Sequence, residues 1–354
     1  MAELDQLLIS LKTLGGSDLH LAAGLEPRIR VHGGLAPVEG WEPLTDKRLR
    51  GLMQEVASER HWESYQAEND ADFAYSLEGV ARFRANFFSQ ENGAGAVFRI
   101  IPEKIVPLED LSLPPAIEKL ADIEGGLVVV TGPTGSGKST TLAAIIDRIN
   151  STRSRHIVTI EDPVEFVHEN KQSVLSHREV GEHSNSFSAA LRAAVRQDAD
   201  VVLVGEMRDR ETIQMAITAA EMGLLVFGTL HTNGAAKTID RIVDAFPASE
   251  QPQIRISLSE SLVGVVSQLL VPTVDGEGRV AVNEILLRTS GLPNLIREGN
   301  ISMIGSVIQS GKKDGMQSMD DALWGLVQSG KIGARDAYLK ASDKGRFESL
   351  PGAS

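Results

Sequence analysis

Short apolar patterns separated by turns fill the first 100 residues of the chain. Apolar residues recur every three to four positions over residues 4–14, which predicts an amphipathic helix that ends at Gly15-Gly16. Alternation of apolar and polar positions predicts half-buried strands over residues 18–21, 28–31, 73–77, 83–87 and 96–100. A further helix is expected over residues 46–67. Several short strands with one or two helices are typical of a small α+β domain, which we place at residues 1–100.

The pattern changes after a proline-rich stretch at residues 101–115, which we interpret as a linker. Predominantly apolar runs at residues 127–130, 157–160, 201–204 and 225–230 then alternate with helical patterns at 140–149, 186–196 and 210–222. This order predicts a parallel sheet covered by helices on both faces, over residues 116–272. Residues 273–354 are expected to be mostly helical, with one helix starting after Ser318. The predicted fold class is therefore α/β with a smaller α+β domain in front.

A glycine-rich segment joins the first apolar run to the helix that follows it. It fits the phosphate-binding pattern G-x-x-x-x-G-K-[ST]. The residues expected to bind nucleotide are Gly132, Pro133, Thr134, Gly135, Ser136, Gly137, Lys138, Ser139 and Thr140. Glycines let backbone N–H groups approach an anion, Lys138 would neutralise the β- and γ-phosphates, and the Ser139 hydroxyl would bind Mg²⁺. The sequence therefore predicts an ATP and Mg²⁺ site.

Acidic residues follow the second and third apolar runs, at the sheet edge where ligands bind in open α/β folds. Glu161 and Glu165 flank Pro163, and either carboxylate would orient or deprotonate the attacking water. The alternative is a solvated acidic loop. Glu206 follows the third run, where an acid of the Walker B type holds Mg²⁺. His231 follows the fourth run, where it would sense the nucleotide state, although a single histidine is more often structural.

Composition narrows the class of protein. The 354 residues include 35 basic and 48 acidic side chains, for a formal charge of −13, and no cysteine. This charge disfavours a nucleic-acid partner, and the lack of cysteine excludes disulfides and a tetracysteine zinc site. We expect no secretory leader and no transmembrane segment, because the apolar runs are too short. A guanine-reading [NT]-K-x-D motif and a dinucleotide-binding G-x-G-x-x-G motif are both missing.

Taken together, these motifs resemble those of the type IV pilus retraction ATPases, the PilT family of the secretion ATPase superfamily. The similarity covers residues 16–21, the P-loop, an Asp box at 161–166, a Walker B segment at 204–209, a His box at 228–232 and a C-terminal signature at 315–320. Unrelated P-loop proteins would share only the P-loop. The resemblance implies a homohexameric ATPase that powers pilus retraction and twitching motility, located in the cytoplasm against an inner-membrane platform protein.

The same resemblance implies a PAS-like N-terminal domain and a RecA-like ATPase domain, with roles assigned by position. Glu161 matches the catalytic glutamate, Glu165 a second Asp-box acid, Glu206 the Walker B acid and His231 the His-box residue. Arginines of the N-terminal domain would stabilise the transferred phosphate, and those in the matching strands are Arg82, Arg84 and Arg99. The alternative for these arginines is an exposed strand face.

Residues 294–298 match the end of the family's retraction motif, A-I-R-N-L-I-R-E, whereas Leu292-Pro293 replaces Ile-Arg. An accessory paralogue therefore stays an alternative to the main retraction motor. We expect Leu295 and Ile296 to contact a partner, the alternative being that both form the buried face of a helix. A RecA-type nucleic-acid translocase and a regulatory switch with little turnover are the other classes considered. The charge argues against the translocase, and the presence of both Glu161 and Glu206 argues against the switch.

Overall fold

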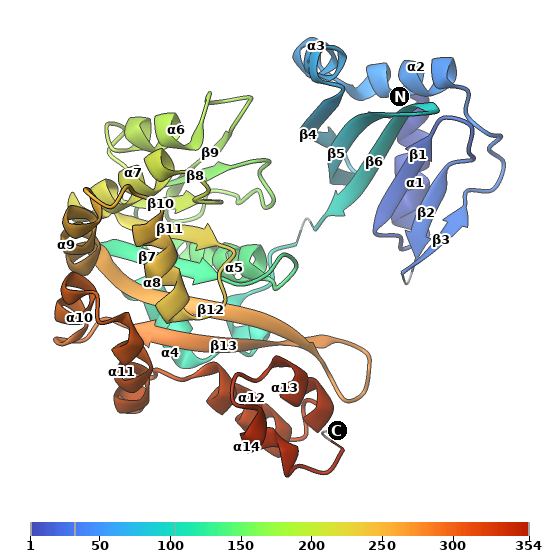
Figure 1. Cartoon of the computed structure of the whole chain (residues 1–354). Helices are drawn as coiled ribbons and strands as arrows, with labels where there is room; N and C mark the ends of the chain where they lie inside the picture. The colour runs from blue at the N-terminus through green and yellow to red at the C-terminus, as the bar shows by residue number, and fades with distance from the viewer. Residues whose placement is uncertain (1, 32, 103, 353–354) are drawn as a thin grey trace. The chain divides into compact units, whose positions relative to one another are not determined.

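A computed structural model describes residues 2–31, 33–102 and 104–352 (Figure 1). The chain divides into two compact units, each with its own core. The N-terminal unit contains residues 1–104 and 162–167, and the C-terminal unit contains residues 105–161 and 168–354. The expected linker at 101–115 includes the end of strand β6, a short 3-10 helix η1 (Leu108–Leu111) and the start of α4 (Pro115–Glu118).

The N-terminal unit is a six-stranded antiparallel sheet in the order β3-β2-β1-β6-β5-β4. Its strands are β1 (Asp18–Ala22), β2 (Arg28–Val31), β3 (Gly34–Pro37), β4 (Asp70–Leu77), β5 (Ala81–Gln90) and β6 (Gly93–Ile101). The helix α1 (Glu3–Thr13) buries Leu4, Leu7, Leu8 and Leu11 in the core of this unit. Burial alternates along β5, so Phe83, Ala85 and Phe87 lie in that core, and Arg82 and Arg84 lie on the opposite face.

The segment expected to form one helix over residues 46–67 forms two, α2 (Asp46–Val56) and α3 (Glu59–Glu68). Ser58 interrupts it, because its backbone is extended and its side-chain oxygen accepts a hydrogen bond from the His61 N–H at 3.3 Å. A serine in this role starts a new helix. The prediction of a single helix was therefore wrong.

The C-terminal unit is built on a seven-stranded sheet in the order β13-β12-β7-β11-β10-β8-β9. The strands are β7 (Gly126–Thr131), β8 (His156–Glu161), β9 (Val174–Glu179), β10 (Val201–Val204), β11 (Leu225–Leu230), β12 (Leu262–Pro272) and β13 (Arg279–Leu287). Every neighbouring pair is parallel except β12 and β13, which form an antiparallel hairpin at one edge. Strands β9, β12 and β13 were not expected from the sequence.

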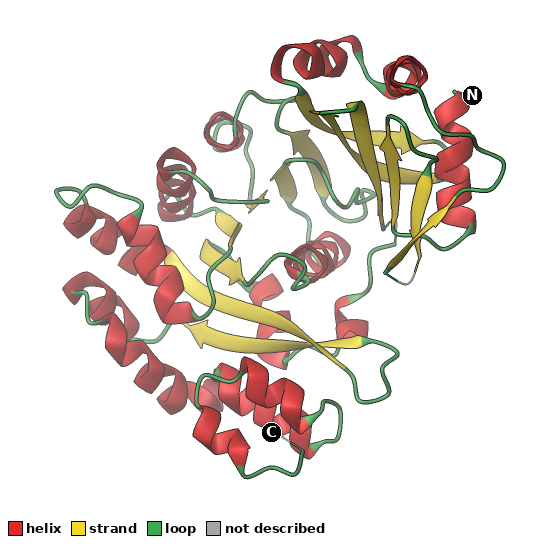
Figure 2. Cartoon of the chain, turned by 45° about the vertical axis from the view of Figure 1, so that its right-hand side comes forward, coloured by secondary structure: helices red, strands yellow, loops and turns green. Residues whose placement is uncertain are grey.

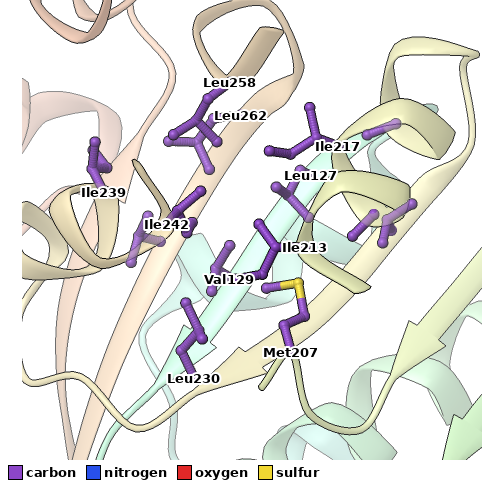
Figure 3. Close-up of a cluster of buried hydrophobic side chains, with 14 of the residues drawn as sticks. Leu127, Val129, Met207, Ile213, Ile217, Leu230, Ile239, Ile242, Leu258 and Leu262 are labelled. Atoms are coloured by element: carbon purple, nitrogen blue, oxygen red, sulfur yellow. The ribbon is translucent and has the colours of Figure 1, made fainter. Parts of the chain in front are cut away.

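Helices cover both faces of this sheet. One face carries η1, α4, the 3-10 helix η2 (Lys119–Asp122) and α5 (Lys138–Thr152). The other carries α6 (Phe187–Ala194), α7 (Arg210–Glu221), α8 (Ala235–Asp244) and α9 (Gln251–Ser261). Successive residues of β7 alternate between the two cores, and Figure 3 shows Leu127 and Val129 beside Ile213 and Ile217 of α7. Burial of these strands on both faces explains the predominantly apolar runs in the sequence.

The C-terminal region is helical after β13. Helix α10 (Leu292–Glu298), η3 (Ile301–Met303) and α11 (Ile304–Ser310) extend the core around α8 and α9. After η4 (Gly311–Asp314), the helices α12 (Met319–Gln328), α13 (Ala334–Lys340) and α14 (Lys344–Glu348) pack on the long β12–β13 hairpin (Figure 2). Among the residues that the structure describes, no helix is both long and apolar enough to cross a membrane.

Candidate nucleotide-binding site

The predicted phosphate-binding loop connects β7 directly to α5. Gly132 and Gly137 have positive φ values of 142° and 83°, which L-residues with side chains rarely adopt. A Cβ on Gly132 would lie 2.1 Å from the Gln268 carbonyl oxygen, so the loop passes too close to β12 for any side chain here. The result is a strand, a tight loop and a helix whose N-terminal N–H groups surround one position, an arrangement suited to a phosphate group.

Lys138 is the buried cation of this loop. Its side chain leaves the first turn of α5, and the residue is 9% exposed. The Nζ atom donates to the carbonyl oxygens of Gly132 at 2.9 Å and of Pro133 at 3.1 Å. The charge is thus held against the loop itself. Ser136 is buried in the same loop, and its hydroxyl has no hydrogen-bond partner among the described residues. A buried ammonium and an unpartnered hydroxyl in one loop fit an anionic ligand.

The other candidate residues of this unit follow the carboxyl ends of neighbouring parallel strands. Glu161 is the last residue of β8 and is 9% exposed. A Cβ on Gly205 would lie 3.3 Å from the Glu161 Cγ, so the side chain lies against the end of β10. Glu206 follows β10 and His231 follows β11. Because these strands are adjacent and parallel, the P-loop, both acids and the histidine share one edge of the sheet.

Glu206 and His231 are in direct contact. The His231 Nε2 lies 3.0 Å from Glu206 Oε1, and the Arg208 guanidinium lies 2.7 Å from Glu206 Oε2. Burial alone would raise the pKa of Glu206, but the hydrogen bond and charge of Arg208, together with His231, hold that pKa below its usual value. The carboxylate is therefore anionic at neutral pH. An ionised acid at this strand end is the chemistry required of a residue that holds Mg²⁺ through water.

A cavity of about 310 Å³ opens next to the P-loop. Its lining includes Thr140 of α5, Leu270 of β12, Arg279 of β13 and Leu111 of η1. Its walls combine apolar side chains with polar ones that can bond to a ligand, as small-molecule sites do.

A family model described as type II/IV secretion system protein matches residues 15–303 of the chain. The chain belongs to this family. The match includes every strand of both sheets and all the sequence-predicted site residues.

Similar proteins match almost the whole length of this chain. The type IV pilus retraction ATPase PilT of Pseudomonas aeruginosa is 49% identical over 96% of the chain and 98% of its own length. The twitching motility protein of Neisseria gonorrhoeae is 50% identical over 90% of the chain and 84% of its own length. The crystal structure of the pilus retraction motor PilT with bound ADP matches this chain with a TM-score of 0.90 and 43% sequence identity. The match covers 99% of this chain and 100% of the PilT chain. The α/β fold and the family expected from the sequence are confirmed.

Three predicted site residues lie on the sheet of the N-terminal unit. Arg82 and Arg84 are on β5 and Arg99 is on β6, and the last two are directly opposite each other across the strand pair. Glu165 lies in the segment 162–167, which also groups with this unit. The roles of these four residues stay predictions.

Several polar residues at this site were not identified from the sequence. The sequence places Arg208 in the segment after β10 but gives it no role. Its contact with Glu206 depends on the conformation of the turn that follows the strand. Gln268 and Asn283 are each 1% exposed beside the P-loop. A polar residue in the middle of the apolar run 262–272 was the available signal, because a buried amide must find partners.

The expectation for Leu295 and Ile296 requires a correction. Both lie on α10, but Ile296 is 1% exposed and belongs to the core around α8 and α9. Leu295 is half-buried. Adjacent residues on a helix point about 100° apart, so the two side chains cannot both face a partner in the same way. Ile296 is a packing residue, and the hypothesis of a contact surface now concerns Leu295 with the exposed Arg297 and Glu298.

Proposed function

We propose that this protein is an ATP-hydrolysing motor that powers the retraction of type IV pili. The proposal rests on one observation: the buried Lys138, Glu161 and the Glu206–His231 pair lie at one edge of the sheet. The chain that carries them is 49% identical to a pilus retraction ATPase over nearly its full length. A bare nucleotide-binding switch would need only the phosphate loop. The additional acids supply what hydrolysis requires.

Each residue at this edge has a distinct part in the proposed reaction. The P-loop and Lys138 bind the phosphates, and the cavity lined by Leu111, Leu270 and Arg279 accommodates the base. Ser139 and the ionised Glu206 would hold Mg²⁺, which supplies charge neutralisation at the phosphates when it is bound. Glu161 orients the attacking water and accepts its proton. His231, in contact with Glu206, responds to the state of the nucleotide.

The arginines of the N-terminal unit complete the proposal. Arg84 pairs with Arg99 across β5 and β6, and Asp18 lies opposite Arg99 on β1. Asp18 is 4% exposed and accepts a hydrogen bond from Arg99 Nε at 2.7 Å. Asp18 orients Arg99, and the exposed Asp72 lies 3.7 Å from the Arg84 Nε. The three arginines still outnumber these two carboxylates, so the row is positive overall, which suits a phosphate group. We place this row at the nucleotide of a neighbouring subunit, in a homohexameric ring.

The decisive test of hydrolysis compares two isosteric variants. Glu161→Gln is expected to bind ATP with near wild-type affinity and to lose most of its turnover, because an amide cannot accept the proton. Glu165→Gln is the matched control and is expected to retain turnover. ATP binding and phosphate release are measured on the purified, assembled protein. The reverse pattern would transfer the base to Glu165, and full activity in both variants would remove the Asp box from the mechanism.

The cellular role is tested in a strain that lacks the gene. Loss of the main retraction motor is expected to leave cells with extra, non-retracting pili and no twitching motility. Cells without pili would indicate an assembly function instead. An accessory paralogue, to which the Leu292-Pro293 replacement points, would leave retraction present but weakened. Recruitment of the protein to the cytoplasmic face of the inner membrane by a platform protein is part of the same proposal.

A further inference from the structure

A buried amide connects the phosphate-binding loop with the edge hairpin of the sheet. Gln268 lies on β12 and is 1% exposed. Its Nε2 donates to the backbone carbonyl of Ser136 at 2.7 Å. Its Oε1 accepts from the Thr141 hydroxyl of α5 and from the Asn283 amide of β13, both at 2.9 Å. One side chain therefore joins the P-loop, the P-loop helix and the last strand of the sheet.

The contact at Ser136 determines the direction of a phosphate-binding group. A peptide unit is planar and trans, so the Ser136 carbonyl and the Gly137 N–H point in opposite directions. Gln268 draws the carbonyl toward β12, which aims the Gly137 N–H away from β12. The fit is close, because a Cβ on Gly137 would lie 3.0 Å from the Gln268 Nε2. Among the described residues, Gln268 is the one side chain that donates a hydrogen bond to this peptide, so it is placed to hold the peptide in this orientation.

The chemistry requires an amide at this position. The Ser136 carbonyl needs a donor, and the two groups on the other side, Thr141 and Asn283, both donate. Glutamine presents a donor and an acceptor at its two ends, whereas glutamate would oppose a carbonyl oxygen with a negative charge. Methionine has a similar volume but makes neither strong bond.

The network continues to the C-terminal segment. The backbone oxygen of Asn283 accepts a hydrogen bond from the Gln317 side chain at 2.8 Å, and the Ile285 N–H donates to the Gln317 carbonyl at 2.9 Å. Glu284 accepts from the Ala235 N–H at the start of α8, just after His231, and from the Met319 N–H at the start of α12. The middle of the β12–β13 hairpin therefore touches the P-loop, the loop after β11 and the C-terminal helices.

We propose that Gln268 is a positioning residue for the phosphate-binding loop, and that through Asn283 it links this loop to Gln317 in the C-terminal segment. The proposal rests on the proposed nucleotide-binding function. Tight nucleotide binding requires the Ser136–Gly137 peptide in the orientation seen here, and a change at the C-terminal segment alters that orientation through β13. The C-terminal helices thereby influence nucleotide affinity without touching the nucleotide.

ADP affinity tests the first half of the proposal, with full-length, assembled protein and a fluorescent ADP analogue as the probe. Gln268→Met is expected to raise the Kd for ADP about tenfold, the effect of about one hydrogen bond, with a larger change in KM than in kcat. Gln268→Glu is expected to raise it further, because the added charge repels the Ser136 carbonyl and the bound phosphates. Unchanged ADP affinity in folded Gln268→Met would overturn the proposal.

A second buried amide provides the matched control. Asn150 lies on α5, is 0% exposed and bonds to the Glu169 carbonyl at 2.7 Å, at the end of the helix far from the P-loop. Asn150→Leu is expected to lower the Tm and to leave ADP affinity unchanged. If Gln268→Met does not fold, Thr141→Val replaces it, since it removes one Gln268 partner at constant volume. Wild-type ADP affinity in that variant would also count against the proposal.

The second half concerns Gln317, which is half-buried and distant in sequence from the P-loop. Gln317→Ala is expected to raise the Kd for ADP about threefold, and adding it to Gln268→Met should raise the Kd no further, because both act on the same peptide. If the effects of the two substitutions on the Kd for ADP multiply in the double variant, Gln317 acts independently of Gln268. Failure of the wild type itself to bind ADP would contradict the nucleotide-binding function, whereas wild-type binding with unaffected variants would contradict only this inference.

Discussion

Lys138 carries the charge most directly tied to nucleotide binding, because it is buried and bonded to two carbonyls of its own loop. Lys138→Ala is expected to weaken ATP binding strongly and to lower kcat/KM about 100- to 1000-fold, since the developing phosphate charge loses its cation. Lys171→Ala is the control, because that lysine is exposed and bonds to Asp147 and Ser151 near the other end of α5. Steady-state hydrolysis measures both, and substantial turnover in Lys138→Ala would exclude the P-loop from the mechanism.

Arg208 is expected to control the charge of its neighbour. Its guanidinium and His231 hold the pKa of Glu206 below the usual value, against the effect of burial. Arg208→Ala should therefore raise the Glu206 pKa and move the acid limb of the kcat/KM profile to higher pH. The profile is measured between pH 4 and 8 with saturating Mg²⁺, and Arg192→Ala, which removes an exposed ion pair on α6, is the control. If the acid limb does not move, the ionisation of Glu206 does not control kcat/KM.

At the same residue scale, the sequence identified the groups whose position follows from the strand ends. Glu161, Glu206 and His231 each follow an apolar run, and adjacent parallel strands bring such residues to one edge. Gln268 and Asn283 were not identified as site residues because they lie in the middle of strands, on a hairpin that the sequence pattern did not reveal. Their role depends on which strand lies beside the P-loop, and one sequence does not contain that order.

At the scale of elements, a buried histidine beside α5 makes stability depend on pH. Burial is the main effect that lowers the pKa of His168 to about 4, and the neighbouring His177 adds to it, although Asp147 opposes the shift. The two rings stack at 5.8 Å. An unfolded histidine has a pKa near 6.5, so between about pH 4 and 6.5 the unfolded chain binds more protons. The stabilisation is complete above pH 6.5 and is lost as the pH falls toward 4.

His168→Gln is expected to remove this pH dependence, which amounts to up to about 3 kcal/mol of unfolding free energy across the window. The Tm of the variant should therefore change less with pH than that of the wild type. Asp147→Asn should have the opposite effect, because Asp147 raises the His168 pKa. Thermal unfolding between pH 4 and 7.5 measures both variants. If the wild type and His168→Gln show the same slope, His168 does not titrate as proposed.

Helix α10 separates a packing residue from a candidate contact residue. Ile296→Ala is expected to destabilise the C-terminal unit by about 2–5 kcal/mol, because it leaves a cavity in the core. Leu295→Ala should cost less than about 1 kcal/mol, since that side chain is half-buried. We expect Leu295→Ala to keep ATPase activity and to reduce pilus retraction in cells. Normal retraction in a strain carrying that variant would show that Leu295 makes no partner contact needed for retraction.

The elements themselves were predicted unevenly. Runs buried on both faces, such as β7 and β11, are predominantly apolar and easily recognised. Strand β9 was missed because its pattern is mostly half-exposed at the sheet edge, and β13 because Asn283 and Glu284 interrupt its apolar residues. The break between α2 and α3 depends on the single serine at 58, whose capping role is weaker evidence than the apolar spacing around it.

At the scale of the whole molecule, the residues proposed for hydrolysis are divided between two units. The P-loop, Glu161, Glu206 and His231 belong to the C-terminal unit, and Arg82, Arg84 and Arg99 belong to the N-terminal unit. A ring formed by repeated head-to-tail contacts brings different surfaces of neighbouring subunits together. If the arginines act on the nucleotide of a neighbour, a single chain is incomplete and the specific activity should rise with protein concentration.

The arginine hypothesis has a direct test in mixed rings. A chain with Lys138→Ala and a chain with Arg84→Ala are each expected to be nearly inactive alone, because every ring lacks one necessary group. In random rings formed from equal amounts, about a quarter of the interfaces combine an intact P-loop with an intact Arg84 from the neighbour. Activity should therefore return to roughly a quarter of the wild-type value, if each site works independently.

The alternative arrangement predicts a different result from the same mixture. If Arg84 serves the nucleotide of its own chain, no subunit in the mixture has both groups, and activity stays at the level of the parents at every ratio. Two affinity tags, one on each chain, confirm that the rings are mixed. Arg60→Ala in place of Arg84→Ala is the control, because Arg60 lies on α3, away from the arginine row on β5 and β6. Persistent inactivity in verified mixed rings would show that Arg84 does not act on a neighbouring subunit.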